Sequence, residues 1–142
     1  MKNNDDFSGP PIGSQLSAII PTLNEAENLG SCLRVIAGTV AELIVVDGGS
    51  SDSTASVASR YNACWIAAKR GRGSQLAIGG AAATGDWLLF IHADTVLQSG
   101  WEHSVYEFIG NGFLSLLSLC SHELFLKGYA KRSTILLGQL LM

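Results

Sequence analysis

The stretch that decides the fold is Leu43-Ile44-Val45-Val46-Asp47-Gly48-Gly49-Ser50-Ser51-Asp52. It opens with a short apolar run that is rich in β-branched residues, which predicts a strand buried on both faces. Acidic, glycine and hydroxyl residues begin where that strand ends. In an open parallel sheet, ligands bind at the carboxyl ends of the strands. Residues 47–52 are therefore a candidate binding loop.

The residues alone allow two interpretations of this loop. The Asp47 carboxylate could accept hydrogen bonds from a nucleobase or a ribose, and Gly48 would let a ligand approach the backbone closely. Alternatively, the segment is only a junction between a strand and a helix, in which Ser50 or Ser51 caps the helix. A second segment with the same organisation favours the first interpretation.

That second segment is the apolar run 16–20, which is followed by Pro21-Thr22-Leu23-Asn24-Glu25. Because proline cannot continue a central strand, we expect the chain to leave the sheet at Pro21. Asn24 is expected to cap the next helix, with Glu27 as its capping-box partner. The buried face of this helix is predicted from the helical spacing of Leu29, Leu33, Ile36 and Val40.

The same order of strand, polar loop and helix continues downstream. The expected elements are a helix over 53–61, a strand over 63–67, a basic loop over 69–73, a helix over 74–84 and a strand over 87–91. Glycines at 79 and 80 weaken the later helix, and Gly85 is its expected C-cap. This alternation predicts an α/β fold, a mainly parallel sheet with helices on both faces.

Composition excludes several classes of protein. The 142 residues suit one domain, and the net charge of −3 argues against a nucleic-acid partner. Cys32, Cys64 and Cys120 lack metal-site spacing and are odd in number, so we interpret them as buried thiols in a reducing, cytoplasmic compartment. Residues 1–14 are polar and are expected to form a flexible lead, not a signal peptide.

Four motifs in this order resemble the family 2 glycosyltransferases, which are inverting enzymes of the glycosyltransferase A-type fold. The motifs are Ile20–Glu25, Val45–Asp52, Arg70–Gly73 and Gly85–Asp94. The His-Ala-Asp-Thr form of the last motif is similar to a small bacterial branch of the family. The resemblance covers residues 16 to about 103 and implies a Rossmann-like, nucleotide-diphospho-sugar transferase half, ending at about residue 110.

The resemblance also implies roles for individual residues. The donor nucleotide would be bound by Pro21, Thr22, Asn24, Glu25, Asp47, Gly48, Arg70 and Arg72. Within this set, the first-strand motif borders the base and ribose, and Asp47 accepts from the base. Arg72, with Arg70 as its alternate, lies near the base and the phosphates.

The resemblance implies a divalent metal, Mg²⁺ or Mn²⁺, as cofactor. Asp94 matches the last aspartate of the family's Asp-X-Asp motif, which ligates the metal on the pyrophosphate. Hard cations of this kind take carboxylate and phosphate oxygens. The first motif position is His92 instead of aspartate, and three roles stay open for it: a metal ligand, a group that orients the sugar, or a structural histidine.

No residue can be assigned as the catalytic base. The carboxylates after Asp94 are Glu102, Glu107 and Glu123, and none matches the family's base. We expect a helix over 100–109 that carries the first two, and no further strand signals in the leucine-rich tail, residues 111–142. A truncated chain or a shifted reading frame explains this tail better than a natural end does. The tail could lie on a membrane surface, anchored by Lys127, Lys131 and Arg132.

These observations lead to a main hypothesis and an alternative. The main one is an inverting, metal-dependent transfer of a sugar from a nucleotide-diphosphate donor to the hydroxyl of an unknown acceptor. The alternative is a truncated, non-catalytic module that binds the nucleotide sugar. A dinucleotide-dependent oxidoreductase is disfavoured because no Gly-X-Gly-X-X-Gly motif follows the first strand.

Overall fold

A computed structural model describes residues 16–103, 105 and 133–137. Its centre is a parallel sheet with the strand order β3-β2-β1-β4-β5. The strands are β1 (Leu16–Thr22), β2 (Glu42–Asp47), β3 (Cys64–Ala67), β4 (Trp87–Ile91) and β5 (Ser133–Leu137). The helices are α1 (Ala26–Ile36), α2 (Thr54–Arg60) and α3 (Arg72–Ala82). The predicted α/β fold with a parallel sheet is confirmed.

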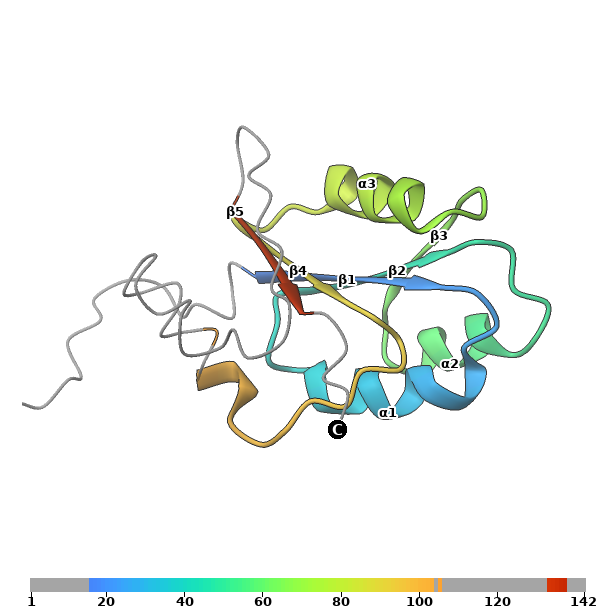
Figure 1. The fold of residues 1–142 in the computed structure, drawn as a ribbon. Coiled ribbons are helices and arrows are strands. Elements are labelled where there is room, and N and C mark those ends of the chain that lie inside the picture. The colour runs from blue at the N-terminus through green and yellow to red at the C-terminus, as the bar shows by residue number, and fades with distance from the viewer. Residues whose placement is uncertain (1–15, 104, 106–132, 138–142) are drawn as a thin grey trace, which may run out of the picture.

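Helices cover both faces of the sheet, as the sequence predicts. Helices α1 and α2 lie on one face and α3 lies on the other (Figure 1). Alternate residues of β1 serve the two layers: Leu16, Ala18 and Ile20 pack in the cluster with α1 and α2, whereas Ile19 belongs to the opposite cluster with Ala83. A strand buried on both faces must be apolar throughout, which explains the continuous apolar runs.

The register of β1 with its neighbours positions the candidate site. Pairing of β1 with β2 continues to Thr22 opposite Asp47, so these two strands end side by side. Pairing of β1 with β4 ends earlier, at Ile19 opposite Phe90. The expectation that the chain leaves the sheet at Pro21 is therefore wrong: Pro21 lies in β1 opposite Val46. The missing N–H is tolerated because Pro21 lies beyond the part of β1 that pairs with β4.

Two helix boundaries differ from those that local capping patterns predict. Asn24 does not cap α1: the N-cap residue is Glu25, without a side-chain capping bond, and Asn24 has a φ of +55°. The helix ends at Ile36, so Val40 lies outside it and only packs against its cluster. The C-cap of α3 is Ala83 and not Gly85.

The tail contributes a strand that the sequence analysis did not predict. Residues 133–137 pair with β4 along its full length, from Trp87 opposite Ser133 to Ile91 opposite Leu137. The segment is short and leucine-rich, and only Thr134 and Ile135 are β-branched, so its strand signal is weak. Of the helix expected over 100–109, residues 101–103 and 105 are helical.

Several other expectations concern residues outside the described ones. These are the lead 1–14, Cys120, the carboxylates of Glu107 and Glu123, and the basic residues 127, 131 and 132. Of the two cysteines described, Cys32 is buried as expected, but Cys64 is exposed, so the expectation of a buried thiol there is wrong. Among the helices that the structure describes, none is long and apolar enough to cross a membrane.

Candidate functional site

The loops after β1 and β2 are joined by hydrogen bonds at the carboxyl ends of the strands, a side of the sheet called its carboxyl edge below. The backbone N–H of Asn24 donates to Ser50 Oγ at 2.7 Å, and the backbone N–H of Ser51 donates to Asn24 Oδ1 at 2.8 Å. This exchange accounts for the left-handed backbone of Asn24, a conformation that asparagine tolerates better than most residues. The predicted residue is thus in the site, but it joins two loops instead of capping a helix.

The start of α1 is capped by residues of the other loop. The backbone N–H of Glu25 donates to Thr54 Oγ1 at 3.0 Å, and that of Ala26 donates to Asp52 Oδ2 at 3.1 Å. Asp52 also accepts from the backbone and hydroxyl of Thr54, and these hydrogen bonds lower the pKa of its carboxyl. A cap supplied from 26 to 29 residues away leaves no local signal in the sequence.

The Asp47 carboxylate lies at the centre of this loop pair and is 4 % exposed. Oδ1 accepts from Thr22 Oγ1 at 3.0 Å and from Ser50 Oγ at 2.5 Å. Oδ2 accepts from the backbone N–H groups of Gly49 at 3.0 Å and Ser50 at 2.8 Å. A carboxylate offers about four acceptor positions, and here the protein uses all of them.

These contacts also set the charge state of Asp47. Burial raises the pKa of its carboxyl, but the hydrogen bonds from Ser50, Thr22 and Gly49 together outweigh burial and hold the pKa below its usual range. Asp47 is therefore a charged group at neutral pH, compensated by two hydroxyls and two backbone N–H groups. The hydroxyls can rotate, so they are the two donors that a ligand could replace.

A buried glutamine on α3 connects the strand ends to the basic loop. Gln75 Nε2 donates to the carbonyl oxygen of Thr22 at 2.9 Å and to that of Val46 at 2.7 Å. Its Oε1 accepts from the backbone N–H of Gly71 at 3.3 Å. None of the sequence motifs predicted this residue, although a polar side chain four residues before Gly79, on the buried face of a helix, is a usable signal.

Gly48 lies close to both Gln75 and the basic loop. A Cβ at this position would lie 3.2 Å from Gln75 Oε1 and 3.3 Å from Arg70 Cα, which is tighter than ordinary van der Waals contact. The sequence predicts that a ligand approaches the backbone at Gly48, and this stays a prediction; the atoms that lie against Gly48 in the structure belong to Gln75 and Arg70.

Exposed arginines flank the start of α3. Arg70 and Arg72 are exposed on either side of Gly71, and Arg72 is the first residue of the helix. The loop begins where Ala68 N–H donates to the carbonyl oxygen of Asp47 at 2.8 Å. Cations are unfavourable at a helix N-terminus, where the dipole and the free N–H groups attract anions. This arrangement is suited to binding a negatively charged ligand.

The fourth predicted motif follows β4, which neighbours β1. His92 is half-buried, Asp94 is exposed, and Thr95 N–H donates to the carbonyl oxygen of His92 at 3.0 Å. Thr95 is 7 % exposed, and among the described side chains its hydroxyl is the buried polar atom without a hydrogen-bond partner. Beneath this turn, Cys32 Sγ donates to the His92 carbonyl oxygen at 3.7 Å.

This motif fits a metal ion that takes only some of its ligands from the protein and the others from a bound molecule. Across the part of the chain that the structure describes, no group of three or more metal-binding side chains occurs. One exposed carboxylate and one imidazole leave most positions of a hard cation to phosphate oxygens and water, as is usual for Mg²⁺. Burial, together with the negative charge of Asp94, raises the pKa of the Cys32 thiol to about 12, so this thiol stays protonated and is not a ligand.

The structure therefore brings most of the predicted donor-site residues together. Thr22 is hydrogen-bonded to Asp47, Gly48 and Gln75. Asn24 is joined to Asp47 through Ser50, and Arg70 lies against Gly48. Pro21 lies in β1, and Glu25 lies in the adjoining loop, where its carboxylate accepts from Asn28 Nδ2 at 2.9 Å. His92 and Asp94 follow the next strand of the same edge.

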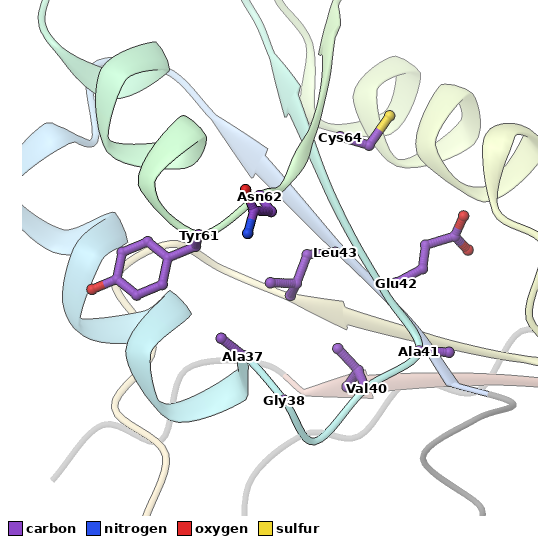
Figure 2. A pocket seen from close by; sticks show the side chains of 9 residues that line it. All are labelled: Ala37, Gly38, Val40, Ala41, Glu42, Leu43, Tyr61, Asn62 and Cys64. Atoms are coloured by element: carbon purple, nitrogen blue, oxygen red, sulfur yellow. The ribbon is translucent and has the colours of Figure 1, made fainter.

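A cavity of about 360 Å³ lies at the opposite side of the sheet, where strands β2 and β3 begin. Figure 2 shows its lining, which comes from the α1–β2 and α2–β3 connections and the first residues of β2 and β3. The one charged residue of the lining, Glu42, directs its carboxylate away from Tyr61 and Asn62. That carboxylate accepts from Ser17 Oγ at 2.5 Å and from Thr84 N at 2.9 Å. The cavity is thus remote from the candidate site.

Comparisons with known proteins agree on one family. The family model described as glycosyl transferase family 2 matches residues 17–133. The match extends past residue 110, where the motif-based resemblance ends, and into the tail.

Individual relatives cover similar parts of the chain. Glucosyl-3-phosphoglycerate synthase of Mycolicibacterium smegmatis is 36% identical over 104 residues, with 64% of this chain and 34% of the relative covered. A PGL/p-HBAD biosynthesis glycosyltransferase of Mycobacterium tuberculosis is 41% identical over 105 residues, with 66% and 41% covered. The chain thus spans 34% and 41% of the length of these two relatives.

A solved structure shows the same fold. The glucosyl-3-phosphoglycerate synthase of M. tuberculosis, crystallised with Mn²⁺, uridine diphosphate and glucosyl-3-phosphoglycerate, superposes with a TM-score of 0.55 at 28% identity. The superposition covers 68% of this chain and 38% of that protein.

Proposed function

The chain belongs to glycosyltransferase family 2, and on that premise we propose that the carboxyl edge of its sheet binds a nucleoside-diphosphate sugar as donor. The complete activity that we propose is transfer of the sugar to an acceptor hydroxyl with inversion and with help from a divalent metal. The observation that carries the proposal is the compensated Asp47 carboxylate between two joined loops, beside an exposed pair of arginines.

The nucleobase would bind at Asp47. A base N–H can replace the hydroxyl of Thr22 or Ser50 as donor, so the buried charge stays compensated when the ligand enters. Such a replacement favours ligands that carry an N–H of matching geometry. The uridine diphosphate bound by the M. tuberculosis synthase supports a uracil base for this chain as well.

The diphosphate would bind between the basic loop and the metal motif. Arg70 and Arg72 supply exposed guanidinium groups, which bind phosphate oxygens bidentately. Asp94 would hold the metal, with His92 as a second ligand candidate, and a bound cation would stabilise the charge of the departing diphosphate. The Mn²⁺ bound by the same synthase supports a divalent cation here and does not distinguish Mn²⁺ from Mg²⁺.

In the proposed reaction, the acceptor oxygen forms a bond to the anomeric carbon on the face opposite the diphosphate. The bond between that carbon and the phosphate oxygen breaks, and the acceptor proton passes to a base. The residues described after Asp94 include one carboxylate, Glu102, which matches no family motif. This observation favours a second candidate function, binding of the nucleotide sugar without transfer.

Calorimetric titration with uridine diphosphate tests the donor site and its metal. We expect Mn²⁺ to tighten binding to the unmodified chain. Asp94→Asn should abolish that gain, because the amide keeps the shape of the side chain but loses its charge. Asp86→Asn is the matched control. This exposed aspartate precedes β4, at the side of the sheet where the strands begin, so Mn²⁺ should still tighten the binding of uridine diphosphate to this variant.

Two results would contradict the proposal. If neither uridine nor guanosine diphosphate binds the unmodified chain, the edge is not a donor site. If Asp94→Asn retains the full effect of Mn²⁺, the site stands but the metal assignment is wrong.

A further inference from the structure

We infer that Gln75 is a positioning residue that holds the basic loop in place for the donor diphosphate. The inference rests on the proposed function and deepens it, because Gln75 matches none of the family motifs that define the donor site. Gln75 would act through the loop, without touching the ligand.

The contacts of Gln75 leave its amide one orientation. The side chain is 4 % exposed, and both hydrogens of Nε2 are used by the carbonyl oxygens of Thr22 and Val46. Thr22 is the last residue of β1, and Val46 is the last but one of β2. Since the amide is planar, the orientation of Nε2 also determines where Oε1 lies. Oε1 then accepts from the N–H of Gly71, at 3.3 Å.

This bond acts on the residue between the two arginines. Gly71 has a φ of +153°, so its backbone adopts a conformation that L side chains rarely adopt. Ser74 Oγ holds the same residue from the solvent side, by donating to the carbonyl oxygen of Gly71 at 2.8 Å. Gln75 therefore relates the basic loop to the strand ends, and Ser74 acts only within the loop.

Other side chains could not replace Gln75. Glutamate would direct a negative charge at two carbonyl oxygens, and methionine has the length but no donor. Asparagine is one methylene shorter, so it could bond a strand carbonyl but would not reach Gly71. Glutamine alone combines two donors, one acceptor and this reach. A buried amide whose hydrogen-bonding groups are all used makes its surroundings rigid, which is what a positioning role requires.

The test is a double-mutant cycle that measures affinity for uridine diphosphate by titration at a fixed Mn²⁺ concentration. Gln75→Met should weaken binding about tenfold, because a misplaced guanidinium forfeits a charge-assisted phosphate bond. In a background in which Arg70 and Arg72 are both changed to methionine, the same substitution should change affinity less than about twofold. Dependence on the arginines is what a positioning role predicts.

Glu42→Gln is the matched control for loss of stability. Glu42 is a partly buried, hydrogen-bonded group at the opposite edge of the sheet, so its substitution should lower the unfolding temperature but leave affinity unchanged in both backgrounds. If Gln75→Met does not fold, Gln75→Asn replaces it, since asparagine can still satisfy a strand carbonyl.

The outcomes separate the inference from the proposed function. If the unmodified chain binds neither uridine nor guanosine diphosphate, the proposed function fails and the inference fails with it. If the chain binds but substitution of Gln75 weakens binding equally with and without the arginines, Gln75 only supports the fold and the inference alone is overturned. An unchanged affinity in the first background overturns it as well.

Discussion

At the scale of single residues, the role of Asp47 differs from that of a free acceptor in a cleft. The sequence places a carboxylate at the end of a buried strand, and the structure shows why it can be tolerated there. Four donors surround it, two of them backbone N–H groups that only the following turn can supply. Asp47 therefore builds the loop before any ligand arrives, and its substitution should affect both stability and binding.

Asp47→Asn should lower the free energy of unfolding at pH 7 by about 2 kcal/mol. An amide offers one acceptor oxygen instead of two, so the Thr22 and Ser50 hydroxyls must rotate to accept, and the bonds from the backbone N–H groups lose the charge of the carboxylate. The pKa of Asp47 is lowered in the folded chain, so its stabilisation is present above about pH 4 and is lost as the pH falls through the folded pKa. Urea unfolding at pH 7 and pH 3 tests this. Acidification should cost the variant less stability than the unmodified chain.

The comparison between the two proteins isolates Asp47. Asp52 and Glu42, whose pKa values are also lowered, titrate in both and cancel in the difference. An equal loss of stability on acidification in the two proteins would contradict the assignment.

At the scale of elements, apolar runs and polar strand ends predicted the first four strands within one or two residues of their observed bounds. The strand ends also predicted that residues 21–25 and 47–52 would lie together, since the carboxyl ends of parallel strands meet at one side of a sheet, and the structure places them so. The sequence did not predict hydrogen bonds between side chains and the backbone of another segment. Asp52 and Thr54 cap α1 in this way, and Gln75 holds the basic loop. Such contacts depend on register, which local patterns do not contain.

The adjacent glycines of α3 provide a prediction at this scale. In sequence terms both simply weaken a helix, but their surroundings differ. A Cβ at Gly79 would lie 2.4 Å from Ile19 Cγ2 and 2.9 Å from Val46 Cγ2. A Cβ at Gly80 would meet Leu88 Cδ1 and Phe90 Cζ at 3.5 Å, an ordinary contact.

Gly79→Ala should therefore destabilise the chain by about 2–3 kcal/mol, because the helix must move away from the sheet. Gly80→Ala should stabilise it by about 0.5–1 kcal/mol through helix propensity. Urea unfolding of the two variants measures both changes. Two changes of the same sign would show that α3 does not pack as closely on β1 and β2 as described.

At the scale of the whole molecule, the described residues form a parallel α/β sheet of a family 2 glycosyltransferase, which we propose binds the donor. The family match over residues 17–133 covers all four motifs. The acceptor site could not be predicted from the sequence, because no carboxylate after Asp94 matches the family's base. Strand β5 shows that residues 133–137 take part in the sheet, which their composition did not indicate.

The last prediction is that these 142 residues by themselves bind uridine diphosphate but transfer glucose from uridine diphosphate glucose at close to the background rate. General base catalysis contributes about 10²–10⁴-fold, and positioning of the acceptor contributes more. Neither a base nor an acceptor-binding residue is identified among the residues that the structure describes, so we expect binding with little turnover. A coupled assay for released uridine diphosphate, run with Mn²⁺ and with simple alcohols as acceptors, measures the rate. A robust rate that Asp94→Asn abolishes would contradict the prediction. Glu102 would then be the first base to test, by Glu102→Gln, because it is the carboxylate that the structure describes after the metal motif.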